Sequence, residues 1–177
     1  MNDSFFEYLH RLELMAFFSG YPLIYILVFF IAGHKPWGSK FKVKTISLLP
    51  YAYALVGTLY FGWQLKKMYP DYSIENISQV LQPAYLIAWG LLAMLFWIPV
   101  MARKPMLSLL HSFVFFYFVV RDIFIQMGAR AIDENIVRND MKLYTVSLLL
   151  NVGCLISITL IYFLIIRFKG HNNSLVQ

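Results

Sequence analysis

The chain has 177 residues, of which 60% are hydrophobic and 14% are charged, and its formal net charge is +6 at pH 7. Soluble globular domains contain about 45–50% apolar and about 25% charged residues, so this composition excludes a soluble domain. A bilayer offers the backbone no hydrogen-bond partners, and the long apolar runs show no alternation of period two, which predicts helices. The predicted fold class is all-α, a polytopic helical bundle integral to a membrane.

Five apolar stretches each approach the roughly 20 residues that a helix needs to cross the hydrocarbon core. They are residues 14–33, 45–65, 83–101, 106–127 and 143–166. Because the connections are short, residues 1–177 are predicted to form a single membrane domain, with residues 1–13 as the interfacial start of the first helix. Residues 167–177 are predicted to be a short cytoplasmic tail, and residues 128–142 a connection with a short amphipathic helix lying on the surface.

Basic residues are distributed unevenly between the two predicted sides of the membrane. One side carries eight without any acid, namely Lys35, Lys40, Lys42, Lys44, Arg103, Lys104, Arg167 and Lys169, whereas the other side carries six mixed with acids. The positive-inside rule then predicts the N-terminus outside and the C-terminus inside. This pattern suits a bacterial inner (plasma) membrane, and Tyr51 and Tyr53 are expected in the inner aromatic belt.

Pro22 lies in the middle of the first predicted span, shortly after Gly20. Proline lacks a backbone N–H and clashes with the preceding turn, so a bend is expected there, with a freed carbonyl that another group must satisfy. A bend that shapes the helix is the simpler interpretation. A discontinuous helix at a binding site is the alternative.

Small residues at four-residue spacing recur in three predicted helices, at Ala16/Gly20, Ala84/Ala88 and Gly153/Ser157. This spacing lets membrane helices approach closely, within one chain or between copies. In the last helix, residues 147, 151, 154 and 158 fall on one face, where only Ser147 and Asn151 are polar.

Arg121 and Asp122 interrupt the fourth predicted helix, where charged groups need partners or water. The polar residues expected at a similar depth complete a candidate cluster of Arg121, Asp122, Asn151, Gln64, Gln126 and Glu13. One hypothesis is a polar pocket open to the outside. The other is a structural ion pair, or an arginine that extends to the headgroups. His111 is a secondary candidate, although a hydrogen-bonded packing role is favoured for a lone intramembrane histidine.

The sequence contains no recognised catalytic motif, phosphate-binding loop or set of metal ligands, so neither an enzyme nor a cofactor is predicted. The favoured hypothesis is a small membrane subunit that assembles with itself or with another membrane protein. A homo-oligomeric channel lined by the polar residues is the first alternative. An intramembrane transporter or enzyme that uses Arg121 and Asp122 is the second.

The predicted partners follow from the same features. They are the lipid bilayer and further copies of the chain or another membrane protein. Nucleic acid is not expected, because the lysines between residues 34 and 44 are explained by the cytoplasmic edge of a membrane.

Overall fold

The structure is a computed structural model that describes residues 3–34, 39–73, 84–128 and 134–174. Its helices are α1 (Asp3–Phe18), α2 (Tyr21–His34), α3 (Ser39–Met68), α5 (Ala84–Leu91), the 3₁₀ helix η1 (Leu92–Trp97), α6 (Pro99–Ala102), α7 (Pro105–Gly128) and α8 (Glu134–Ser174). The fold is 92% helical, and the described residues contain no strand, so the predicted all-α class is confirmed.

Four stretches of the described residues are long and apolar enough to cross a membrane: Arg11–Phe30, Lys44–Met68, Pro105–Ile125 and Met141–Phe168. They correspond to four of the five predicted spans. The last three lie within α3, α7 and α8, each of which extends beyond the span predicted from the sequence. In particular, α8 begins at Glu134, so residues 134–142 continue the spanning helix instead of forming a separate surface helix.

The first span is divided into α1 and α2 by a turn at Ser19 and Gly20, which we call the helix break. The bend predicted from Pro22 is therefore present, two residues ahead of the proline. Pro22 lies in the first turn of α2, where the missing N–H removes no bond within that helix. Pro22 is fully buried, so the break lies inside the bundle.

The stretch predicted as a third span, residues 83–101, is not one α-helix. It consists of α5, η1 and α6, and Ile98 is extended (φ −73°, ψ 123°) before Pro99, as the steric demands of a following proline favour. The 3₁₀ helix packs closely on α3, since a Cβ added at Gly57 would lie 2.9 Å from the Ala93 Cβ. Pro105 opens α7 after a tight turn.

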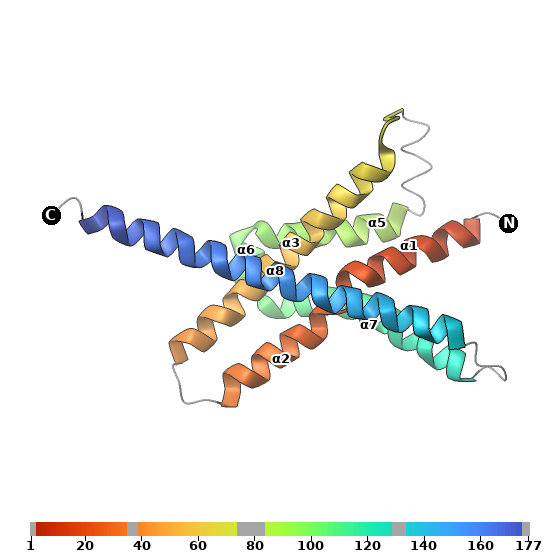
Figure 1. Ribbon diagram of the computed structural model, residues 1–177, viewed down its shortest axis with the longest axis horizontal. Helices are drawn as coiled ribbons and strands as arrows, with labels where there is room; N and C mark the ends of the chain where they lie inside the picture. Colours follow the sequence, from red (N-terminus) through yellow and green to blue (C-terminus); the bar gives the residue numbers. More distant parts are fainter. Residues whose placement is uncertain (1–2, 35–38, 74–83, 129–133, 175–177) are drawn as a thin grey trace.

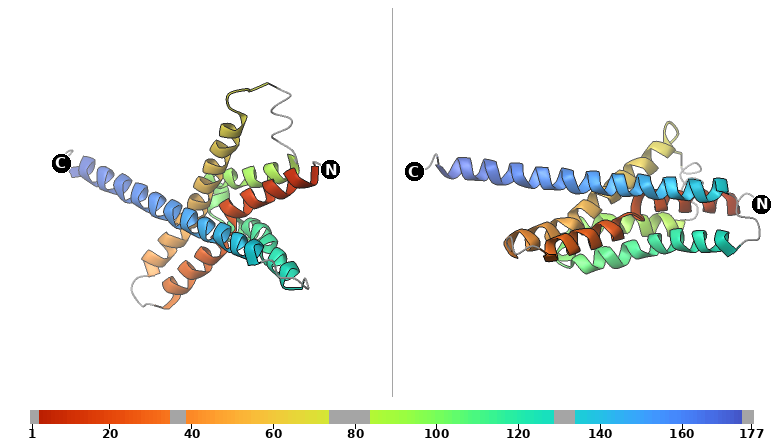
Figure 2. Two further views of the ribbon diagram at one scale, coloured as in Figure 1. Left: turned by 45° about the vertical axis from the view of Figure 1, so that its right-hand side comes forward. Right: turned by 60° about the horizontal axis from the view of Figure 1, so that its bottom comes forward.

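The helices form an elongated bundle in which α8 crosses α3 and contacts it (Figure 1). The start of α1 and the end of α8 lie at opposite ends of the long axis, and the C-terminal part of α8 extends beyond the other helices in all views (Figure 2). The core is rich in aromatic residues, including Phe18, Tyr53, Tyr60 and Phe115, none of which is exposed. The expectation that Tyr53 lies in the aromatic belt was wrong, because its ring is fully buried.

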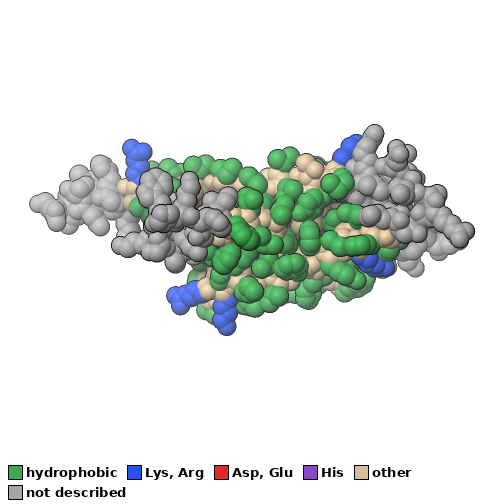
Figure 3. Space-filling view, turned by 90° about the horizontal axis from the view of Figure 1, so that it is seen from below, with side chains coloured by type: hydrophobic (Ala, Val, Ile, Leu, Met, Phe, Trp, Pro, Cys, Tyr) green, Lys and Arg blue, Asp and Glu red, His purple; other side chains and the backbone are tan. Residues whose placement is uncertain are grey.

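The surface is apolar along most of its length. On the face in Figure 3, hydrophobic side chains cover the middle, and the Lys and Arg side chains lie toward the two ends. Such a band between charged ends matches the surface that a membrane protein presents to lipid and headgroups. The helices, by their length and composition, thus indicate a membrane protein.

Candidate functional site

The helix break is held by two polar side chains of α8. The backbone N–H of Gly20 donates to the Ser147 hydroxyl at 2.8 Å, and the Asn151 Nδ2 donates to the Phe17 carbonyl at 2.8 Å. In a continuous helix the Phe17 carbonyl would accept from the amide of Tyr21. The α8 side chains therefore replace hydrogen bonds that the break removes, as buried backbone groups in a membrane require.

Close backbone contact makes this arrangement possible. A Cβ added at Gly20 would lie 2.6 Å from the backbone nitrogen of Leu148, so only glycine allows α8 to approach this near. Gly20 belongs to one of the small-residue pairs, and its predicted role in a close helix contact is confirmed. The α8 face that includes Ser147, Asn151 and Cys154 is consequently buried in the chain's own core.

A second polar group lies between α1 and α3. Lys67 Nζ donates to both carboxylate oxygens of Glu13, at 3.0 Å and 2.9 Å. Gln64, one turn before Lys67 on α3, is 2% exposed, and Tyr60 is fully buried another turn away. Among the described residues, neither the Tyr60 hydroxyl nor either atom of the Gln64 amide has a hydrogen-bond partner. An unsatisfied buried polar group destabilises a fold by about 1–3 kcal/mol.

His111 is hydrogen-bonded at both ring nitrogens. Its Nε2 lies 2.9 Å from the Trp89 carbonyl and its Nδ1 lies 2.7 Å from the Tyr53 hydroxyl. Since a carbonyl only accepts, Nε2 carries a proton, and in the neutral ring Nδ1 accepts from Tyr53. The ring also stacks on Trp89 at 5.0 Å and 9°. This geometry matches the packing role and ties α7 to α3 and α5.

Trp89 lies close to the junction of α5 and η1, where the hydrogen-bond spacing changes from four residues to three. The histidine therefore supplies a donor next to a helix irregularity, as Ser147 and Asn151 do at the helix break.

The structure distributes the predicted cluster over several places. Glu13 pairs with Lys67, and Asn151 bonds to the helix break. Asp122 is partly buried, and Arg121 is exposed on the surface of α7. The side chain of Gln126 lies outside the described residues. Whether Arg121 and Asp122 have a functional role stays a prediction.

The residues that the sequence analysis missed are Tyr53 and Tyr60, which were not recognised as core polar groups. The Tyr53 hydroxyl bonds to His111 of α7, and the Tyr60 ring packs on Phe17 and Phe18 of α1, so the burial of both depends on tertiary packing. A weak signal was present, because Tyr53, Tyr60 and Gln64 follow the three- and four-residue spacing of one helix face.

The chemistry available at these places is hydrogen bonding and ion pairing. Among the described residues, no three His, Cys, Asp or Glu side chains are placed to bind a metal ion. The free Cys154 is buried in the interior between helices.

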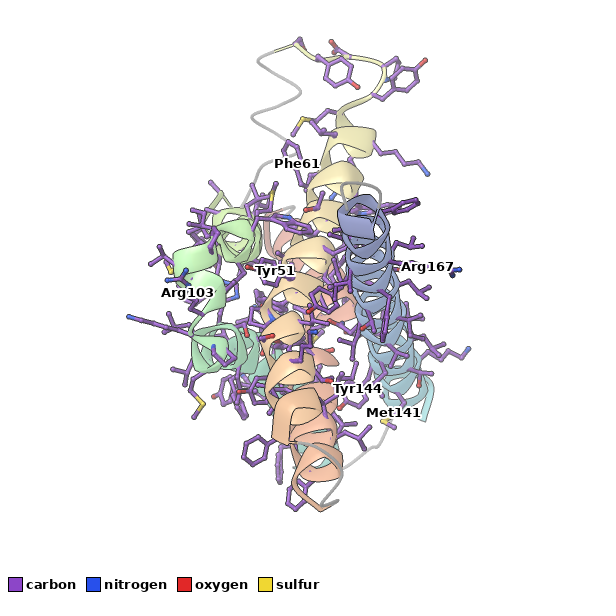
Figure 4. All side chains as sticks on the ribbon, turned by 90° about the vertical axis from the view of Figure 1, so that its left-hand side faces the viewer. Tyr51, Phe61, Arg103, Met141, Tyr144 and Arg167 are labelled. Atoms are coloured by element: carbon purple, nitrogen blue, oxygen red, sulfur yellow. The ribbon has the colours of Figure 1, made fainter. Side chains whose placement is uncertain are left out.

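Figure 4 shows the end of the bundle from which α8 emerges. Arg103, on the turn before α7, and Arg167, near the end of α8, both extend away from the helices. Tyr51 lies on α3 between these two basic residues in this view.

Comparison with protein-family models, with curated proteins and with solved structures finds no match to this chain.

Proposed function

We propose that the protein is a membrane subunit without catalytic activity, which assembles through α8 with a transmembrane helix of a second copy or of another membrane protein. The observation that carries this proposal is the unequal packing of the spans. Only 17% of the α8 span is buried, whereas 50% of the first span is buried. Helix α8, which bonds to the helix break between α1 and α2, thus leaves most of its own surface uncovered by the rest of the chain.

The uncovered surface has the residue pattern of a helix contact. We define the outer face of α8 by Leu149, Gly153, Ile156 and Leu160, which are spaced four, three and four residues apart, so they share one side of the helix. The three large side chains are 68%, 55% and 58% exposed. Gly153 lies between them, and a Cβ added there would meet nothing within 4 Å.

A small residue in such a position allows another helix to approach closely. Ser157 follows Gly153 by four residues, is also exposed, and donates its hydroxyl to the Gly153 carbonyl at 2.8 Å. In the bilayer, where lipid is as apolar as leucine, close packing at small residues is a main source of helix association. Gly20 uses such an approach within this chain, and Gly153 offers it to another helix.

The mass of the purified protein in detergent, with bound detergent subtracted, tests this proposal. Gly153→Leu should lower the assembled fraction about ten-fold, which corresponds to about 1.4 kcal/mol. Gly62→Leu is the matched control, because Gly62 is an exposed glycine of α3 whose added Cβ would also meet nothing within 4 Å. A monomeric wild-type protein without a bound partner, or equal effects of both variants, would contradict the proposal.

For the topology we infer five membrane passes with the N-terminus outside. The stretch from Ala84 to Ala102 is short for a span, but its 3₁₀ portion rises about 2.0 Å per residue against about 1.5 Å in an α-helix. With this longer rise the stretch reaches about 30 Å, the thickness of the hydrocarbon core. An odd number of passes also agrees with the opposite positions of the start of α1 and the end of α8 (Figure 1). The bacterial inner membrane stays a prediction from the sequence.

A further inference from the structure

Tyr60 and Gln64 are buried polar side chains that the helix packing does not satisfy. The Tyr60 ring is fixed in the core, with ring centroids 5.3 Å from Phe17 and 5.4 Å from Phe18. Gly90 lies against the same ring, because a Cβ added there would lie 2.7 Å from Tyr60 Cε1. The hydroxyl therefore has little freedom to turn toward a better partner.

The two side chains form one local group with the Glu13–Lys67 ion pair. Tyr60, Gln64 and Lys67 are spaced four and three residues apart on α3, so they share a face. The Gln64 side chain is close enough to the Tyr60 hydroxyl to act on it as a hydrogen-bonding group, and Glu13 acts on it through its charge. Neither contact reaches full hydrogen-bond geometry, so the Tyr60 hydroxyl and the Gln64 amide stay without a partner among the described residues.

This group lies close to one end of the bundle. Gln64 is four residues from the end of α3 at Met68, which is about 6 Å along a helix. The side chains of Glu13 and Lys67 are 17% and 23% exposed, so the ion pair reaches the surface, whereas Gln64, three residues before Lys67, is buried.

We propose that Tyr60 and Gln64 line a water-filled site that opens to the surface where Glu13 and Lys67 form their ion pair. The lining groups are neutral and include a hydroxyl, an amide donor and an amide acceptor, which is the combination that water or a small neutral amide or alcohol satisfies. The ion pair covers the site, so breaking it exposes the site further.

The first test separates a hydrated site from a dry one by thermal unfolding in detergent. Tyr60→Phe keeps the ring and removes only the hydroxyl, and Gln64→Met keeps the length of the side chain. If water satisfies these groups, both variants lower the midpoint of unfolding. If the groups are dry and unpaired, both variants raise it, because removal of an orphaned polar group stabilises the protein. That result would overturn the proposal.

The second test measures access from water directly. In a Cys154→Ala background, Gln64→Cys and Val56→Cys are treated with a small cationic methanethiosulfonate reagent in proteoliposomes. Val56 is a fully buried apolar residue two turns further into α3 and serves as the control. We expect the cysteine at position 64 to react at least about ten-fold faster than the cysteine at position 56, because a site open to water is reached more often than one that is protected by packing. Adding Glu13→Gln should raise the rate at position 64 alone.

Equal rates at positions 64 and 56, with or without Glu13→Gln, would show that water does not enter and would overturn the proposal. Both cysteine variants must first show the unfolding transition and the detergent-corrected mass of the parent protein. This result is independent of the assembly proposal, because the site lies between α1 and α3 and the outer face of α8 takes no part in it.

Discussion

Asn151 joins two helices that lie far apart in the sequence. Its Nδ2 donates to the Phe17 carbonyl in α1 and to the Ser147 carbonyl in its own helix. Replacement by leucine introduces an apolar side chain of roughly similar size and leaves the Phe17 carbonyl without this donor. We expect Asn151→Leu to lower the free energy of unfolding by about 0.5–2 kcal/mol, measured by denaturation in mixed micelles.

Ser157→Ala is the control for Asn151→Leu. Ser157 is exposed and, within the part of the chain that the structure describes, its hydroxyl bonds to the carbonyl one turn before it, so its removal should change the unfolding free energy by less than about 0.5 kcal/mol. If Asn151→Leu were as mild as this control, the hydrogen bond to the helix break would not contribute to stability.

The hydrogen bond between His111 and Tyr53 can be measured by a double-mutant cycle. His111→Phe leaves the Tyr53 hydroxyl and the Trp89 carbonyl without their partner, whereas Tyr53→Phe removes one partner only. We expect the double variant to be more stable than the sum of the single effects predicts, with a coupling of about 0.5–2 kcal/mol in unfolding free energy. Additive single effects would mean that the two side chains do not interact.

At the scale of single residues, the buried polar residues could be identified from the sequence more readily than their hydrogen-bond and ion-pair partners. Asn151 and Gln64 stood out because polar residues are rare in apolar spans. The partner of Asn151 is a backbone carbonyl that only the helix break makes available. The partner of Glu13 is Lys67, a residue that the sequence pattern did not single out. Such partners depend on tertiary contacts that one-dimensional spacing does not contain.

At the scale of elements, the glycines differ in what surrounds them. An added Cβ at Gly20 would lie 2.6 Å from a backbone nitrogen, one at Gly90 would lie 2.7 Å from the side chains of Leu14 and Tyr60, and one at Gly62 would meet nothing within 4 Å. Side chains can shift, whereas the α8 backbone cannot do so cheaply. The destabilisation by alanine should therefore decrease from Gly20 to Gly90 to Gly62.

Thermal midpoints of the three alanine variants in one detergent test this order. Gly62→Ala should be neutral or slightly stabilising, because alanine favours a helix by about 0.5–1 kcal/mol over glycine. A Gly20→Ala variant as stable as Gly62→Ala would contradict the close contact between the helix break and α8.

The spans that are single helices were predictable because length and hydropathy determine them, as for α3, α7 and α8. The stretch from Ala84 to Ala102 was not. Its 3₁₀ portion packs closely at Ala93 on Gly57 of another helix, a tertiary contact that the sequence does not contain. Pro99 was visible in the sequence, but the extended Ile98 before it was not anticipated. The helix break was anticipated because Gly20 and Pro22 give a local signal.

At the scale of the whole molecule, the proposed topology places the two ends of the chain on opposite sides of the membrane. Single cysteines at Tyr72, in the segment after α3, and at Arg103 test this arrangement in a Cys154→Ala background. Both residues are exposed. In intact cells, an impermeant thiol reagent should label position 72 and should label position 103 only after the membrane is opened. Labelling of both positions from outside would contradict the five-pass arrangement.

The outer face of α8 is the feature on which the proposed assembly depends, and photo-crosslinking in native membranes tests it most directly. In the test variant, a photoreactive phenylalanine analogue replaces Ile156 on this face. In the control variant, it replaces Leu110 of α7, which is 57% exposed. We predict a protein adduct of one defined mass from position 156, whose yield Gly153→Leu lowers about ten-fold, and lipid adducts from position 110. Lipid adducts alone from both positions would contradict the account.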